Sequence, residues 1–97
     1  MTEIEIPVPL SAKPTLAPRT VERACTTLDL TLTLKGTLAK YPGCIHWHYK
    51  KGKERATLEI TWWPRERRLW LKVARNRRSD WIEDAIPRLK RYLESKL

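Results

Sequence analysis

Cys44, His46 and His48 alternate along one short segment and are the residues best suited to bind a metal ion. Alternate residues of a strand point to the same side, so the thiol and both imidazoles would share one face of a sheet. Zinc binds such side chains, but this spacing matches no common zinc-finger pattern, and a fourth ligand would have to come from another segment. Successive residues on one face lie about 6.6 Å apart, which one ion bridges only with favourable rotamers. We therefore expect no metal and no other cofactor.

The two histidines are also the candidates for acid–base catalysis. Glu59 is the single carboxylate expected beside them, and the sequence has no serine-triad order, no glycine-rich phosphate loop and no nucleophile elbow. The sequence therefore predicts a protein that is not an enzyme. A ribonuclease that uses His46 and His48 for acid–base work is the alternative.

Positive charge is concentrated in one segment. The 97 residues include 20 Lys or Arg and 11 Asp or Glu, for a net charge of +9. Residues 50–78 hold eleven of these cations against three glutamates, so +8 of the net charge lies there. This pattern predicts an anionic partner such as nucleic acid or an acidic protein. The alternative is an arginine-rich solvated surface without a partner.

Three strand-like runs would position these residues: Cys44 to Lys51, Ala56 to Trp63, and Arg68 to Ala74. The short turn segments between them predict a three-stranded antiparallel meander. Alternation predicts a core face made of Ile45, Trp47, Tyr49, Leu58, Ile60, Trp62, Leu69, Leu71 and Val73. The apolar residues that follow Asp80 recur at helical spacing, so we expect a C-terminal helix packed on that face.

Antiparallel pairing would bring two basic segments together. The loop after the first strand and the end of the third strand lie at the same end of a meander. The final helix begins there, and its N-terminus adds a partial positive charge that suits phosphates. The seven cations expected at this end are Lys50, Lys51, Lys53, Arg55, Arg75, Arg77 and Arg78.

The opposite sheet face mixes aromatic rings with cations, as single-stranded nucleic acid requires for stacking and phosphate binding. It is expected to present His46, His48, Trp63, Arg68, Trp70 and Lys72. Two alternatives remain open. One is a solvated face on which the two tryptophans pair across the hairpin, and the other is a protein–protein interface.

The segment 26–41 fits two structures. Its leucines at 28, 30, 32 and 34 alternate, which favours a strand. Asp29 near its start and Tyr41-Pro42-Gly43 at its end favour a helix. We predict the helix, which gives an α+β fold in the order α-β-β-β-α with both helices on one face of the sheet. The alternative is a four-stranded antiparallel sheet with one C-terminal helix.

The first twenty residues are rich in proline. Pro7, Pro9, Pro14 and Pro18 exclude a regular helix. The alternation of Ile4, Ile6, Val8 and Leu10 predicts a segment extended along a surface or a sheet edge, and a disordered arm is the alternative. We divide the chain into a proline-rich extended arm, 1–20, and a single α+β domain, 21–97.

The compartment is predicted from what the sequence lacks. It has no apolar run approaching the ~18 residues of a membrane span and no signal-peptide pattern. Its two cysteines are too few for a disulfide scaffold. We therefore expect a cytoplasmic protein that does not enter a membrane.

The predicted order of elements over residues 26–97, with basic residues in the first hairpin and before the last helix, resembles the double-stranded-RNA-binding fold. In that family a histidine-bearing first-hairpin loop enters a minor groove, and a lysine-rich start of the last helix grips phosphates across the major groove. The resemblance implies the first role for Lys51-Gly52-Lys53-Glu54-Arg55 and the second for Arg75-Asn76-Arg77-Arg78.

The sequence therefore predicts a small basic nucleic-acid-binding protein that contacts mainly phosphates, with RNA favoured over DNA. The alternative is a protein–protein adaptor or inhibitor. It would use the His/Trp sheet face and the N-terminal arm against an acidic partner, and the arm could also mediate a dimer.

Overall fold

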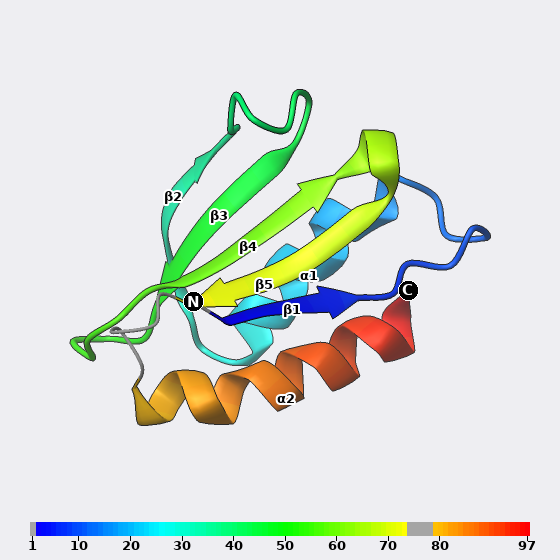
Figure 1. The fold of residues 1–97 in the computed structure, drawn as a ribbon. Coiled ribbons are helices and arrows are strands. Elements are labelled where there is room, and N and C mark those ends of the chain that lie inside the picture. Colours follow the sequence, from blue (N-terminus) through cyan, green and yellow to red (C-terminus); the bar gives the residue numbers. More distant parts are fainter. Residues whose placement is uncertain (1, 74–78) are drawn as a thin grey trace.

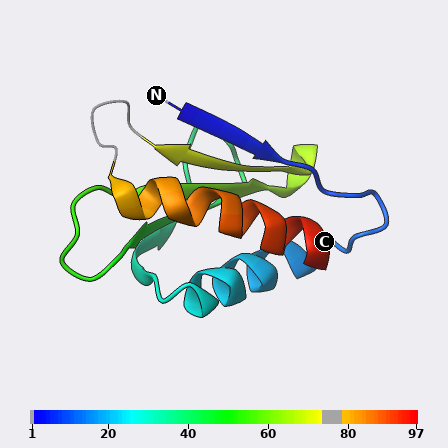
Figure 2. The same ribbon diagram turned by 90° about the horizontal axis from the view of Figure 1, so that it is seen from below.

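The computed structural model describes residues 2–73 and 79–97 and has an α+β fold (Figure 1). Its elements are β1 (Thr2–Ile6), α1 (Leu16–Thr27), β2 (Thr31–Gly36), β3 (Ile45–Lys50), β4 (Leu58–Trp63), a 3₁₀ turn (Pro64–Glu66), β5 (Arg68–Val73) and α2 (Asp80–Lys96). The strands form one antiparallel sheet in the order β1-β5-β4-β3-β2. Both helices lie side by side on one face of this sheet (Figure 2).

The central strands β3, β4 and β5 form the predicted meander, and the predicted core face is confirmed. Of the nine residues expected there, eight are buried, and Ile45 is partly buried against the core. Trp47, Ile60 and Leu71 are fully buried and stand opposite one another on adjacent strands. Burial of these large apolar side chains is the main favourable term that holds the sheet to the helices.

The predicted C-terminal helix is confirmed as α2. Ser79 precedes it, and the Ser79 backbone carbonyl accepts hydrogen bonds from the N–H groups of Ile82 and Glu83. Apolar residues at helical spacing turn one side of the helix toward the sheet. Its buried residues are Trp81, Ile82, Ala85, Leu89 and Leu93.

The helix predicted over residues 26–41 is wrong, because this segment holds the end of α1 and the whole of β2. The α1 helix ends in a Schellman motif: the Asp29 N–H donates to the Thr26 carbonyl, and the Leu30 N–H donates to the Cys25 carbonyl. Asp29 takes the left-handed conformation (φ 60°), which turns the chain into β2. The alternating leucines lie in and just before this strand, as the strand alternative predicted.

The exclusion of a helix from residues 1–20 is also wrong. The α1 helix begins at Leu16 and carries Pro18 in its first turn, where a backbone N–H would have no partner inside the helix. Its buried residues are Ala17, Thr20, Val21, Ala24 and Cys25, which form one mainly apolar stripe. The domain boundary predicted at residue 20 therefore falls inside a helix.

The start of the chain forms an edge strand of the sheet. Strand β1 pairs with β5, and Ile6 stands opposite Leu69 and is buried. An extended segment on a sheet edge is thus confirmed for residues 2–6. The two edge strands, β1 and β2, make the sheet five-stranded, so the predicted three-stranded α-β-β-β-α order is incomplete.

Candidate functional site

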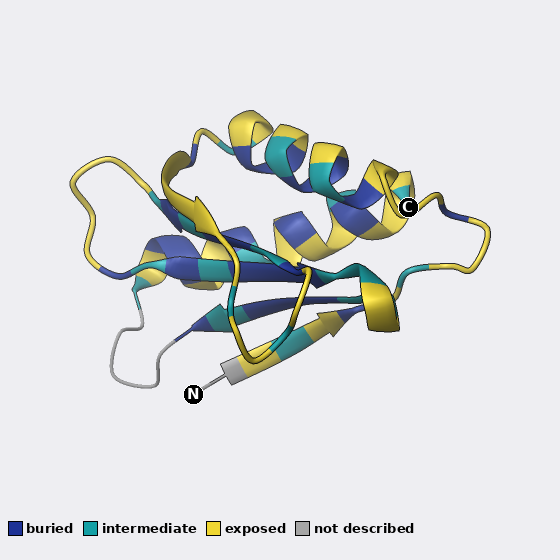
Figure 3. Ribbon diagram, turned by 90° about the horizontal axis from the view of Figure 1, so that it is seen from above, coloured by how far each residue is buried: buried dark blue, intermediate teal, exposed yellow. Residues whose placement is uncertain are grey.

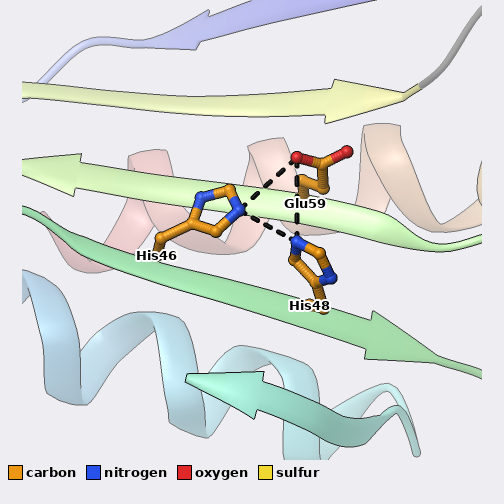
Figure 4. Close-up of side chains that lie close together, drawn as sticks. All are labelled: His46, His48 and Glu59. Carbon is orange, nitrogen blue, oxygen red and sulfur yellow. Dashed lines mark hydrogen bonds and ion pairs between the residues drawn. The ribbon is translucent and has the colours of Figure 1, made fainter. Parts of the chain in front are cut away.

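Three side chains that could bind a cation meet on the outer face of the sheet, which is the face opposite the helices. His46 and His48 lie two residues apart on β3, and Glu59 lies on β4 directly opposite His48. Because Trp47 and Tyr49 point into the core, the alternate histidines must point outward. Figure 4 shows the two imidazole rings and the carboxylate pointing toward one another.

The atoms of this His46–His48–Glu59 cluster are close together. Nε2 of His46 lies 2.9 Å from Nε2 of His48. Oε1 of Glu59 lies 3.4 Å from Nε2 of His46 and 3.8 Å from Nε2 of His48. Nδ1 of His46 lies 2.8 Å from Oγ1 of Thr61, a buried hydroxyl on β4. The cluster therefore has a buried end at His46 and an open end, where the side chains of His48 and Glu59 are 33% and 28% exposed.

Burial and neighbouring charges act together on His46. Desolvation lowers the pKa of His46 most, repulsion from His48 and Lys72 lowers it further, and Glu59 raises it. Lys72 lies on β5, directly opposite Glu59. The His46 imidazole is therefore neutral at neutral pH, so one ring nitrogen keeps a free lone pair.

Cys44 does not belong to this cluster. Its thiol is buried, and its Sγ accepts a hydrogen bond from the Leu38 N–H at 3.3 Å. The Cys44-x-His46-x-His48 segment therefore contributes two candidate ligands, and the strand beside it contributes the third. The structure thus differs from the arrangement considered in the sequence, in which all three candidates came from one strand.

The prediction of an open aromatic face is wrong, because the β2–β3 connection folds over it. The Tyr41 ring packs edge-on against both Trp63 and Trp70, with 5.0 Å between ring centroids in each pair. Trp70 is only 3% exposed, and the Trp63 indole N–H donates to the Pro42 carbonyl at 3.0 Å. Figure 3 shows this connection crossing the sheet. Trp70 is therefore not free to stack on a base, and the partly exposed Trp63 is held against Tyr41 and Pro42.

The predicted basic loop lies at the end of the sheet where α2 begins (Figure 1). Lys51, Lys53 and Arg55 are exposed, and Lys50 is half-buried at the end of β3. None of these four cations forms an ion pair with another described residue. The Trp81 indole N–H donates to the Arg55 carbonyl at 2.8 Å, which ties the loop to α2. The other three cations predicted at this end, Arg75, Arg77 and Arg78, lie outside the described residues.

Of two further cations predicted to bind nucleic acid, Arg68 is paired with an acid within the chain and Lys72 lies between two glutamates of the neighbouring strands. The Arg68 guanidinium donates two hydrogen bonds to the Glu5 carboxylate, at 2.8 and 3.2 Å, and lies 4.7 Å from the Trp70 ring. Lys72 is flanked by Glu3 on β1 and Glu59 on β4. Arg68 therefore stabilises the β1–β5 edge, and Lys72 belongs to the surroundings of the His46–His48–Glu59 cluster.

Sequence reasoning missed a groove between the two helices. Its volume is about 320 Å³, and it is lined by Leu16, Arg19, Thr20, Arg23, Tyr92 and Lys96. Arg19 and Arg23 are four residues apart and so share one side of α1. The spacing is present in the sequence, but it indicates a shared face only in a helix, and the prolines of residues 1–20 argue against a helix there.

Comparison of the chain with protein-family models, with curated proteins and with solved structures found no match in any of the three. Within residues 2–73 and 79–97, no helix is long and apolar enough to cross a lipid bilayer. Function must therefore be inferred from the contacts, burial and charges described above.

Proposed function

We propose that this protein binds nucleic acid, RNA ahead of DNA, through the phosphates of the backbone. The β3–β4 loop is the principal contact in this proposal. The observation that carries it is the set of unpaired cations on that loop, three of them exposed and none in an ion pair with a described residue. Elsewhere, surface cations such as Lys35, Arg68 and Arg88 have acidic partners.

Two features support a phosphate ligand at this end. Glu54 is the only acid in the loop, so it offsets only part of the positive charge. A hydrogen bond from Trp81 also holds the loop beside the first turn of α2. The N-terminus of a helix carries a partial positive charge, which favours anions. The sequence places Arg75, Arg77 and Arg78 immediately before that helix, which adds to the basic character of the segment.

The cover over Trp63 and Trp70 on the outer face determines the kind of recognition that we expect. Trp70 is buried under Tyr41, and the Trp63 indole is hydrogen-bonded to the Pro42 carbonyl. This face therefore offers no pair of open aromatic rings on which bases could stack. Binding should therefore depend on phosphates and vary little with base sequence. The preference for RNA rests on the basic hairpin in the sequence alone, because the helix that the resemblance needs over residues 26–41 is replaced by the end of α1 and by β2.

The test is a titration of labelled RNA and DNA, each single- and double-stranded, at several salt concentrations. Log affinity should fall linearly with log salt, because each neutralised phosphate releases counterions. The double variant Lys51→Gln/Lys53→Gln should weaken binding to all sequences and reduce the salt slope by about 1.5 to 2 units. The matched control is Lys13→Gln/Arg65→Gln, which removes the same charge from exposed residues at the opposite end of the sheet.

The control distinguishes a loss of affinity caused by removing specific phosphate contacts from one caused by the lower net charge of the protein. If both double variants reduce the slope equally, the loop is not the principal contact. If Arg19→Gln/Arg23→Gln reduces it instead, the phosphates lie in the groove between the helices. No binding to any of the four nucleic acids at low salt would refute the proposal.

The alternative of a protein adaptor keeps one supporting observation. All six residues of the edge strand β2 are exposed, including Leu32 at 44% and Leu34 at 47%. An open edge with exposed leucines can accept a partner strand. The surfaces first predicted for this role are used within the chain, since Tyr41 covers the tryptophans and β1 pairs with β5.

A further inference from the structure

We propose that His46, His48 and Glu59 bind one divalent transition-metal ion, with Zn²⁺ as the best fit, on the outer face of the sheet. The ligand atoms are Nε2 of both histidines and Oε1 of the glutamate. The proposal is independent of nucleic-acid binding, because it rests on other residues and another face of the molecule.

The distances between the three atoms match the requirements of a single ion. Zinc binds nitrogen and carboxylate oxygen at about 2.0–2.2 Å, and tetrahedral geometry then separates the ligand atoms by about 3.3–3.5 Å. The observed separations are 2.9, 3.4 and 3.8 Å. They bracket the required value, so small rotations of the partly exposed His48 and Glu59 side chains would complete the geometry.

The contacts inside the cluster are also compatible with a bound cation. A neutral imidazole carries one proton, and Thr61 lies 2.8 Å from Nδ1 of His46. With that proton on Nδ1 and donated to Thr61, the lone pair on Nε2 of His46 points at His48 and Glu59. Such an outer hydrogen bond is the usual way in which a metal-binding histidine is oriented. A proton shared between the two rings would relieve one contact, whereas a metal ion satisfies all three atoms together.

The chemistry of the surroundings specifies the class of ion. Two imidazoles and one carboxylate suit zinc and its neighbours in the first transition row better than calcium or magnesium, which prefer oxygen ligands. The exposed side of the cluster leaves a fourth position for water, as in zinc sites with three protein ligands. Lys72 faces the cluster from β5, and its positive charge opposes the binding of a cation.

The experiment is a titration of the tag-free protein with Zn²⁺ by calorimetry and with Co²⁺ by visible absorption. We expect one equivalent of metal per chain, absorption typical of four-coordinate Co²⁺, and a melting temperature that rises with added Zn²⁺. His48→Gln and Glu59→Gln should each weaken binding at least tenfold. The control Cys44→Ser should bind Zn²⁺ as tightly as the unchanged protein does, because the Cys44 thiol is hydrogen-bonded to the Leu38 N–H and lies outside the cluster.

A further variant tests the proposal in the opposite direction. Lys72→Met removes the facing positive charge and should tighten Zn²⁺ binding severalfold. Circular dichroism of each variant without metal identifies those that fail to fold, and His48 and Glu59 are exposed enough for substitution at both to be tolerated. The absence of saturable binding, or equal binding by the unchanged protein, His48→Gln and Glu59→Gln, would overturn the proposal. Loss of binding in Cys44→Ser would also overturn this set of ligands.

Discussion

The indole Nε1 of Trp81 donates a 2.8 Å hydrogen bond to the backbone carbonyl of Arg55. This bond joins the first turn of α2 to the β3–β4 loop, although the two residues are 26 positions apart in the chain. The Trp81 side chain is itself buried. The basic loop is thereby fixed against a helix.

Substitution of Trp81 by Phe tests this link. Loss of the hydrogen bond and of part of the ring should lower the free energy of unfolding by about 1–3 kcal/mol. Nucleic-acid affinity should fall modestly while its salt slope is kept, because the loop cations are unchanged. Urea denaturation and the binding titration measure the two effects. A reduced slope in the folded variant would show that Trp81 itself contributes to the phosphate site.

The covered outer face leads to a prediction about stability. Trp70→Ala should lower the free energy of unfolding by about 3–5 kcal/mol, as expected for truncation of a buried tryptophan. Leu71→Ala, on the core face, should cost about 2–5 kcal/mol. The two variants should therefore be comparable in chemical denaturation. A nearly neutral Trp70→Ala would mean that Tyr41 does not cover this face in solution.

The meander could be predicted because local pattern and burial agree in it. Apolar and polar residues alternate along β3 and most of β4, and the inward-facing residues of β5 keep the same period of two although Trp70 lies between Leu69 and Leu71. The N-terminal half was harder to predict, because its elements begin and end where single residues adopt particular backbone conformations. Pro18 is tolerated only because it falls in a first turn, and Asp29 ends α1 by adopting a conformation that usually favours glycine.

The candidate site was predictable in part. Alternation places His46 and His48 on one face and suggests Glu59 beside them, but the strand register and the rotamers decide whether their atoms meet. The cover over Trp70 was not predictable, because the β2–β3 connection has no periodic pattern and Tyr41 acts through tertiary contacts. The basic loop was found because charge can be counted without knowledge of the fold.

Glu22 should make the fold sensitive to acid. Hydrogen bonds from Lys35 and then from the Trp47 indole hold the pKa of this carboxyl below its usual 4.5. In the unfolded chain the group binds protons more readily, so its stabilising contribution is present above the usual pKa and lost as the pH falls below it. Urea midpoints measured from about pH 5 to about pH 3 should decline less steeply in Glu22→Gln. Identical pH profiles would contradict the role given to this carboxylate.

The buried hydroxyl of Thr61 offers the most specific test of the metal proposal. Thr61→Val keeps the shape of the side chain but removes the 2.8 Å contact with Nδ1 of His46. The imidazole would then lose the partner that fixes its orientation and tautomer. Removal of an outer partner of this kind typically weakens metal binding 10–100-fold. The same Zn²⁺ titration measures the change.

Thr57→Val is the matched control for this substitution. Thr57 immediately precedes β4, is partly exposed and has no described contact with His46. It should leave Zn²⁺ affinity unchanged. Equal affinities for Thr61→Val and the unchanged protein would show that His46 needs no orienting partner. Weaker zinc binding in Thr61→Val but not in Thr57→Val would show that the affinity for zinc depends on the tautomer of the buried His46.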